Sequence, residues 1–195
     1  MSLSSKPDKP QRPTDEPPLG GRAPSRGSAP RVEGGRGGKV LRETNEEARR
    51  QARAFVRDSP HGALATLEPG TSWPLASRVS LAVDVDDIPL ILISRLSTHY
   101  GALELDPRCS LLLGEAGDGD PLRHPRITVV CLAKKVPSDQ RAAAKAQFLK
   151  RHPDAQMYAD FTDFDFWRLG PQRASLNAGF GKAYTLTADD LKTQR

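Results

Sequence analysis

The stretch LASRVSLAVDVDDIPLILISRLSTHYGALELDPRCSLLL, residues 75–113, is the part of the sequence that decides the fold class. Residues 75–85 alternate between two sets of side chains, which is the period-two pattern of a strand. A turn at DDIP leads to the aliphatic run LILIS, residues 90–94, which predicts a central strand. Apolar residues then stop at a step rich in hydroxyl and basic side chains, residues 94–99, and resume in CSLLLGE, residues 109–115. The expected faces of the first strand are Val79, Leu81, Val83 and Val85 on one side and Arg78, Ser80, Ala82 and Asp84 on the other.

The rest of the chain extends this pattern in both directions. RITVVCLAKKV, residues 126–136, is a fourth clear strand, and tight turns between such strands favour an antiparallel sheet or barrel over βαβ units. Two segments have helical periodicity and stop signals, with Thr44 and Ser138 as their expected N-caps. The fold class is therefore mainly β with flanking helices (α+β). The further expected elements are strands at 61–67, 164–169 and 179–186 and helices at 44–57 and 138–152.

The composition divides the chain into two parts. Residues 1–38 hold seven Pro, seven Gly and no aromatic residue, so this segment is expected to be a disordered, mildly basic tail. Of the formal net charge of +5, the tail contributes +3, because it holds seven basic and four acidic residues. Residues 39–195 are long enough for one domain and only slightly basic, so nucleic-acid binding is not expected of them. An alternative, that RVEGGRGGK in the tail binds nucleic acid, stays open as the weaker reading.

The two cysteines and the hydropathy pattern limit the class of protein further. Cys109 and Cys131 show no CxxC spacing, which argues against structural zinc and against a disulfide framework; both are expected to be small, buried side chains. No run approaches the ~18 apolar residues of a membrane helix, and the N-terminus lacks the apolar core of a secretory signal. We expect a soluble, cytoplasmic protein with no membrane contact and no structural metal.

The step at residues 94–99 has the chemistry of an anion site. Ser94, Ser97 and Thr98 supply hydroxyl groups, and a helix beginning in THYGALEL would add backbone N–H groups at its positive end. Arg78, on the preceding strand, supplies a guanidinium that can hold two phosphate oxygens. The same hydroxyl pattern is also typical of a simple helix cap, and residue chemistry alone does not decide between the two.

The order of the motifs resembles a known family. HGALATL, the segment 74–113, GDPLRHPRITVVCLAKKV and the segment 141–183 are similar, in order and spacing, to the FMN-binding split-barrel family related to pyridoxamine 5′-phosphate oxidase. Within that family, the resemblance is strongest to the branch that includes haem-utilisation oxygenases. It spans residues 61 to about 186, nearly all of the expected domain.

This resemblance implies a six-stranded antiparallel split barrel that forms a homodimer, with FMN at the subunit interface. It implies cofactor contacts in three places: the strand that carries Arg78, Val79 and Ser80, the hydroxyl-rich step at 94–99, and the start of the strand at 126–136. Ala102 stands where members often carry Asn, and it cannot replace that amide. The expected cofactor-binding residues are Arg78, Val79, Ser80, Ser94, Arg95, Thr98, His99 and Arg126, and no catalytic side chain is identified.

The function that follows from the resemblance is that of an FMN-binding oxidoreductase acting on an unidentified small molecule. Flavin chemistry resides in the cofactor, so the lack of a recognisable triad fits this reading. The alternative is a non-catalytic dimer that stores or senses a flavin or haem, because the C-terminal TLTADDLKTQR lacks the substrate motif of pyridoxamine-phosphate oxidases. Haem and deazaflavin are the secondary cofactor candidates. Haem would need a histidine ligand: His99 lies in the step, His61 is expected to cap or pack, and His124 and His152 are expected to face solvent.

Overall fold

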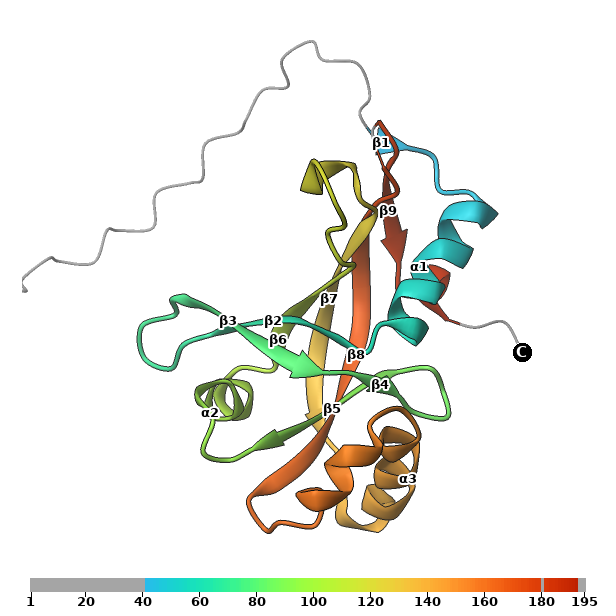
Figure 1. Ribbon diagram of the computed structural model, residues 1–195. Coiled ribbons are helices and arrows are strands. Elements are labelled where there is room, and N and C mark those ends of the chain that lie inside the picture. The colour runs from blue at the N-terminus through green and yellow to red at the C-terminus, as the bar shows by residue number, and fades with distance from the viewer. Residues whose placement is uncertain (1–40, 180, 193–195) are drawn as a thin grey trace, which may run out of the picture. The chain divides into compact units, whose positions relative to one another are not determined.

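One sheet of nine strands forms the frame of the domain in the computed structural model, which describes residues 41–179 and 181–192 (Figure 1). The described residues belong to one compact unit, residues 37–195, and the predicted tail, residues 1–38, lies outside them. The mainly β architecture with a few helices agrees with the predicted class, whereas the number of strands is nine rather than six. The strands are β1 (Leu41–Arg42), β2 (His61–Leu67), β3 (Pro74–Ser80), β4 (Ala82–Val83), β5 (Pro89–Ser94), β6 (Arg108–Leu113), β7 (Arg126–Lys135), β8 (Phe164–Asn177) and β9 (Ala183–Thr187).

The pairing order makes the sheet return on itself. From β3 it runs through β2, β6, β7 and β8 to β5 and then to β4, all antiparallel. Because β3 and β4 are consecutive parts of one chain segment, this path ends where it began, as in a barrel. The 14-residue strand β8 pairs with β5 through its first part and with β9 through its last part. β9 continues the sheet beyond the barrel and adds β1 as its one parallel neighbour within residues 41–179 and 181–192.

The strand predicted at 75–85 is interrupted at Leu81, which corrects the sequence analysis. β3 pairs with β2 as far as Ser80, and the hydrogen bond from Leu81 N to the Pro60 carbonyl (2.8 Å) is the last one in this register before Ala82 and Val83 pair with β5. Leu81 and Ala82 are both buried, so the alternation changes phase. Beyond this point Asp84 is buried and Val85 is exposed, the reverse of the predicted faces. The cause is that the Asp84 carboxylate accepts hydrogen bonds from the next turn and from Arg168 (2.6 Å).

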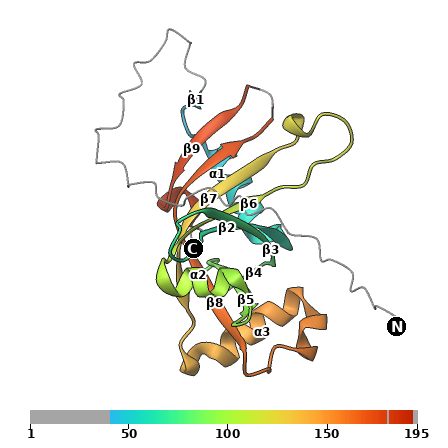
Figure 2. The ribbon, with the colours of Figure 1, turned by 90° about the vertical axis from the view of Figure 1, so that its left-hand side faces the viewer.

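Three α-helices cover the sheet at separate places. α1 (Glu46–Asp58) lies beside β9, whereas α3 (Arg141–Arg151) lies at the opposite end, near β5 (Figures 1 and 2). The N-cap of α1 is Asn45, whose side chain accepts from Ala48 N (2.9 Å), rather than the predicted Thr44. α2 (Thr98–Leu105) is the short helix after the hydroxyl-rich step. Short 3-10 turns are η1 (Pro121–Arg123), η2 (Ser138–Gln140), η3 (Pro153–Met157) and η4 (Asp189–Leu191). Over the described ranges, no helix has the length and apolar character that a membrane span requires.

Two apolar clusters hold these layers together. The larger fills the barrel and reaches α1 through Ala48, Ala52 and Val56. The smaller packs α3 against β5 and β8 around Phe148 and Phe166, whose ring centroids lie 5.7 Å apart. These clusters fix β5 and β8 firmly, and both strands lead directly into the site described next.

The cysteines lie inside the larger cluster, as the sequence predicts. Cys109 and Cys131 face each other across β6 and β7, and both are buried free thiols. The register between β7 and β8 shifts between Val130 and Cys131, opposite Pro171. A bulge at this position lets β8 pass through a proline, which has no N–H to donate. β8 therefore continues well past the predicted end at Leu169.

Candidate functional site

A pocket of about 300 Å³ opens where β3, β5 and the start of α2 meet. β3 contributes the Arg-Val-Ser sequence, β5 contributes its last residues, and the turn after β5 contributes the hydroxyl-rich step. Five of the eight residues expected to bind a cofactor line this pocket, although they come from segments about 15 residues apart. The lining residues are Arg78, Val79, Ser80, Leu92, Ile93, Ser94, Ser97, His99, Tyr158 and Phe164.

The step after β5 is a tight turn that leads into α2. Ser97 is the N-cap residue of α2, but its side chain does not cap the helix; its hydroxyl donates to the Ser94 carbonyl (2.7 Å). The first turn of α2 places His99 toward the pocket and leaves Thr98 exposed. The interpretation of the hydroxyls as a simple cap therefore does not describe Ser97.

Ser94 is already engaged by an acidic side chain from the other end of the chain. Its hydroxyl donates to Asp163 Oδ2 (2.6 Å) and accepts from Leu96 N (3.1 Å). The backbone N–H of Arg95 donates to the Asp163 carbonyl (2.7 Å), so the turn is attached to the segment before β8 twice. The hydroxyl proton of Ser94 consequently points toward a carboxylate.

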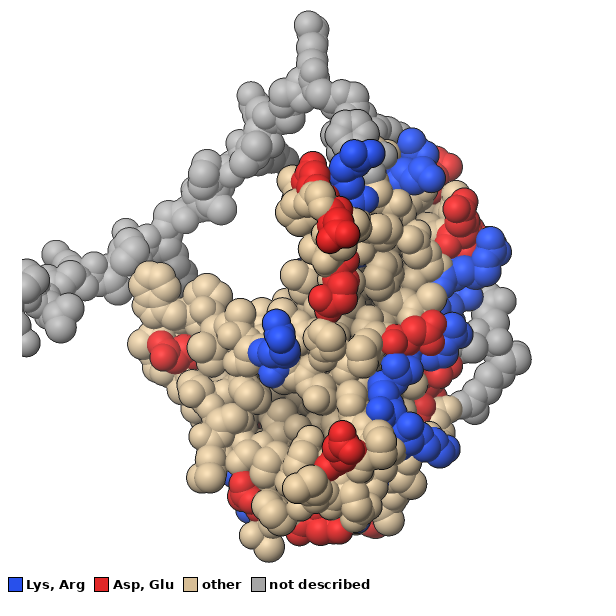
Figure 3. Space-filling model, viewed as in Figure 1, with Lys and Arg blue, Asp and Glu red and all other residues tan. Residues whose placement is uncertain are grey.

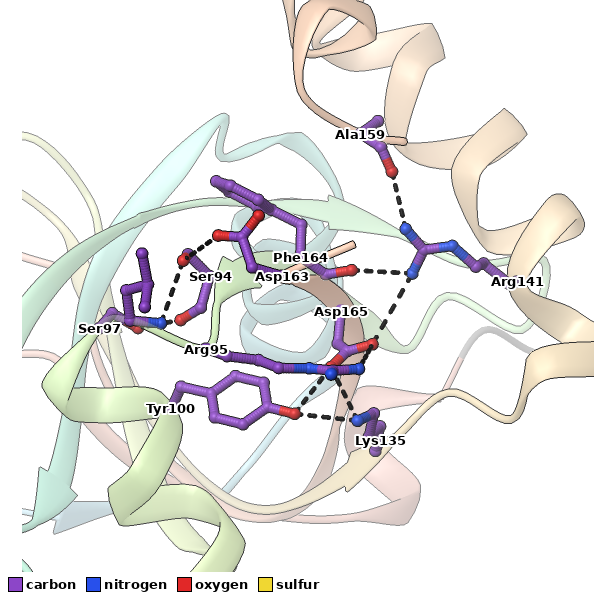
Figure 4. A network of polar contacts seen from close by, with 11 residues as sticks. Ser94, Arg95, Ser97, Tyr100, Lys135, Arg141, Ala159, Asp163, Phe164 and Asp165 are labelled. Atoms are coloured by element: carbon purple, nitrogen blue, oxygen red, sulfur yellow. Dashed lines mark hydrogen bonds and ion pairs between the residues drawn. The ribbon is translucent and has the colours of Figure 1, made fainter. Parts of the chain in front are cut away.

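Arg95 is turned away from the pocket by a second carboxylate, that of Asp165 on β8 (Figure 4). Its Nε lies 2.8 Å from Asp165 Oδ2, and the same oxygen accepts from Tyr100 OH (2.7 Å) and lies 2.7 Å from Lys135 Nζ. Arg141 Nη1 lies 3.9 Å from the other oxygen. Burial alone would raise the pKa of Asp165, but the hydrogen bonds from Arg95, Lys135 and Tyr100 hold it well below its usual range. Asp165 therefore stays ionised at neutral pH and keeps Arg95 bound.

Two other predicted residues also lie outside the pocket. Arg126 opens β7, and its Nη1 donates to the carbonyls of Leu122 (3.1 Å) and His124 (3.2 Å) in the loop before it. Thr98 is exposed on α2. Thus the structure brings together Arg78, Val79, Ser80, Ser94 and His99, and it separates Arg95, Thr98 and Arg126 from them.

The histidines differ in what they contact. His99 is partly buried in the pocket, and burial lowers its pKa, so its imidazole is neutral at neutral pH. His61, the first residue of β2, has its Nε2 2.7 Å from Oε1 of Glu115. His152 was expected to face solvent, but its Nε2 lies 2.9 Å from the Leu81 carbonyl and its ring packs on Phe148 with centroids 4.8 Å apart. His124 Nε2 lies 3.0 Å from the Asp118 carbonyl.

Arg78 stands at the junction of this pocket and the outer face of the sheet. It is exposed, and within the described part of the chain it makes no hydrogen bond or ion pair. Its cross-strand neighbour is Ala63, which in turn pairs with Leu112, 45% exposed. Figure 3 shows that the surface over the β2–β3 hairpin is mainly uncharged, while charged side chains gather on the side of α1. Arg78 is therefore a cation that lies at the edge of an apolar surface and has no partner among residues 41–179 and 181–192.

Aromatic residues form the opposite wall of the pocket, and the sequence analysis did not identify them as site residues. Tyr158 and Phe164 pack with ring centroids 5.1 Å apart, and Phe161 lies 6.4 Å from Phe164. In the sequence of residues 160–165 the acidic residues interleave with phenylalanines, a pattern that predicts alternating exposure rather than a ligand site. The register of Ser94 opposite Phe164 brings this segment to the pocket, and a separation of 70 residues hides that pairing in the sequence.

Comparison with known proteins agrees with this architecture. Residues 43–192 match a family described as "CREG, beta-barrel". A curated relative, "Non-canonical heme oxygenase HOZ, chloroplastic" of Arabidopsis thaliana, is 31% identical over 152 residues, which cover 75% of this chain and 46% of the relative. The chain thus spans less than half the length of that relative.

Solved structures give the same picture. A heme binding protein from Mycobacterium smegmatis is 29% identical with a TM-score of 0.68, over 76% of this chain and 60% of that protein. The Agrobacterium tumefaciens protein Atu2129, of unknown function, is 31% identical with a TM-score of 0.70, over 85% of this chain and 66% of that one. The resemblance to split-barrel proteins and their haem-utilisation branch, predicted from the motifs, is confirmed.

Proposed function

Because this chain belongs to the CREG β-barrel family, we propose that it binds haem in the pocket between β3, β5 and α2, and that it does so as a homodimer. The observation that carries the proposal is the combination of His99, Arg78 and an aromatic wall in that one pocket. The Arabidopsis relative is named a heme oxygenase and the mycobacterial one a heme binding protein, and both names support the choice of cofactor.

The residues of the pocket suit the chemistry of haem. A neutral imidazole is the form of histidine that binds iron, and burial keeps His99 in that form. Tyr158, Phe164 and Ile93 offer apolar contact to a flat macrocycle. Arg78 offers its guanidinium to a propionate carboxylate. When bound, haem supplies an iron centre that can hold or activate oxygen, and this chain's contribution is to bind, orient and shield it.

The incomplete enclosure of the pocket supports the proposal of a homodimer. A volume of about 300 Å³ lies at the lower end of the range of ligand pockets, which bury most of the ligand surface. The adjoining sheet face carries Ala63, Ala76 and Leu112 without covering side chains from the described residues. A second copy laid on this face would complete the pocket and bury the exposed apolar surface. Arg78 would then lie at the seam between the two subunits.

FMN is the second candidate cofactor, and it has an observation of its own. Arg78, Val79, Ser80 and Ser94, the core of the expected FMN site, do converge. However, a phosphate needs several free donors, and the two strongest in the step, the Ser94 hydroxyl and Arg95, are occupied by Asp163 and Asp165. We therefore propose haem as the first cofactor candidate and FMN as the second. Correspondingly, storage, sensing or turnover of haem is the first functional candidate, and an FMN-dependent oxidoreductase activity is the second.

Titration of the purified protein with haem and, separately, with FMN tests the proposal. We expect a saturable Soret shift with haem, with the sedimentation coefficient of a dimer, and little quenching of FMN fluorescence. Binding of FMN in place of haem would reverse the ranking of the cofactors. If the protein is a monomer and still binds haem tightly, the proposal that two subunits share the site is wrong.

A further inference from the structure

We infer that Asp163 and Asp165 are specificity-determining residues, which make the pocket reject cofactors that carry a phosphate. This inference rests on the proposed function, because it concerns the selectivity of the same pocket. The two acids lie two positions apart where the chain enters β8, and each contacts a different donor of the step after β5 (Figure 4).

The first contact changes what Ser94 presents to a ligand. Its only proton is donated to Asp163 Oδ2 at 2.6 Å, so the hydroxyl can offer a ligand nothing but lone pairs. A phosphate oxygen at Ser94 would therefore meet an acceptor instead of a donor. It would also lie close to the negative charge of Asp163, and like charges at short range repel strongly in a partly buried site.

The second contact removes the cation of the step. Arg95 gives both Nε and Nη2 to Asp165, at 2.8 and 3.4 Å. Asp165 is only 8% exposed and is also bound by Tyr100 and Lys135, so the network holds it in one place. Two donors that the sequence suggests for a phosphate, the Ser94 hydroxyl and the Arg95 guanidinium, are thus already bonded to acidic residues of the same chain.

A haem ligand does not depend on these donors. Its iron needs the neutral His99, and its carboxylates can reach Arg78, and neither residue is bound by Asp163 or Asp165. The two acids therefore discriminate against phosphate without reducing the groups available to haem. This is selection by an unfavourable contact with the wrong ligand, rather than by an extra contact with the right one.

The test is a gain of phosphate binding in Asp163→Asn. Asparagine keeps the size of the side chain, removes its charge and, through its carboxamide N–H, adds a donor. We expect the dissociation constant for FMN, measured by fluorescence quenching, to fall by about tenfold or more, with the haem dissociation constant within about threefold of wild type. Asp165→Asn, which releases Arg95, should act in the same direction, and inorganic phosphate should compete with FMN in both variants.

Asp160→Asn is the matched control. Asp160 lies in the same segment and carries the same charge, but it pairs with Lys145 (2.7 Å) and makes no described contact with residues 94–99. A gain of FMN binding in Asp160→Asn equal to that in Asp163→Asn would reduce the effect to general electrostatics and overturn the inference. No gain in either Asp163→Asn or Asp165→Asn, with both variants folded by circular dichroism, would also overturn it. Haem binding is measured on the same samples, so failure of the proposed function would be seen separately.

Discussion

Replacing Arg78 by alanine is the most direct test of how the pocket holds its ligand. Arg78 is exposed and makes no ion pair or hydrogen bond within the described residues, so its removal breaks no internal interaction. The free energy of unfolding of the Arg78→Ala variant should therefore stay within about 0.5 kcal/mol of that of the wild type. A contact with a ligand carboxylate is different, because a charge-assisted hydrogen bond contributes about 1.5–3 kcal/mol. The dissociation constant for haem should rise about ten- to hundredfold.

The assay compares two ligands as well as two proteins. Soret titrations are made with haem and with haem dimethyl ester, whose carboxylates are blocked, on wild type, Arg78→Ala and Arg78→Lys. The loss in Arg78→Ala should appear with haem and vanish with the ester, and lysine should restore part of it, since it keeps the charge but not the fork geometry. Arg50→Ala, an exposed arginine on α1, controls for net charge. An equal loss with both ligands, or none with either, would show that Arg78 does not bind a carboxylate.

Three further outcomes can be measured on single variants. His99→Ala should move the Soret maximum of the haem complex and weaken binding, whereas an unchanged spectrum would exclude His99 as the iron ligand. Phe148→Ala empties a fully buried position in the smaller cluster and should lower the free energy of unfolding in urea by about 3–5 kcal/mol. The pKa of Asp190 is lowered to about 2, chiefly by its hydrogen bond from Arg49 and also by Thr187 N. Asp190 should therefore stabilise the fold fully above its unfolded pKa, about 4, and lose that effect as pH falls toward 2, so the melting temperatures of wild type and Asp190→Asn should converge in acid.

Local sequence pattern was sufficient for most of the barrel. The strand predicted at 61–67 is β2, with the same bounds, and the one predicted at 126–136 is β7, one residue shorter. These strands have one buried face, so their alternation is visible in a single sequence. The aliphatic run at 90–94 is buried along nearly its whole length, and its brevity and flanking turns marked it as a strand.

The failures lie where a distant contact overrides the local pattern. The alternation through residues 75–85 gave no sign that the chain changes partner at Leu81, because the new partner, β5, and the Asp84–Arg168 pair are set by tertiary packing. The strand predicted at 164–169 ends before Gly170 and Pro171, and both residue types are unfavourable inside strands. A bulge in β8 accommodates them: the consecutive residues Val130 and Cys131 of β7 pair with Arg173 and Pro171, which leaves Gln172 without a partner in the ladder. The position of this bulge is set by the register against β7, a strand about 40 residues earlier in the chain.

The candidate site shows the same division more sharply. Sequence reasoning placed Arg78 and the step at 94–99 in one pocket. Arg78 and three residues of the step line it, whereas Arg95 and Thr98 do not; the three are Ser94, Ser97 and His99. It did not find Asp163 and Asp165, because a hydroxyl or a guanidinium was counted as a donor wherever it occurred. A donor is available to a ligand only if the fold has not already given it an acceptor. After the hydrogen bonds of Ser94, Arg95 and Ser97 are assigned, four polar side chains of the pocket have no hydrogen-bond partner among the described residues: Arg78, Ser80, His99 and Tyr158.

That remaining set has a chemical meaning. One guanidinium and one neutral imidazole beside an aromatic wall match a ligand that carries a carboxylate and a metal ion on a large apolar ring. They match a phosphate dianion less well, because only one cation remains for it, and Ser94 and Arg95, which the step would add, are bonded to Asp163 and Asp165. The family resemblance alone permits either cofactor, since the motifs that carry it include every residue of the step. The choice is made by two carboxylates at the start of β8, which lie about 70 residues away in the chain and about 3 Å away in the fold.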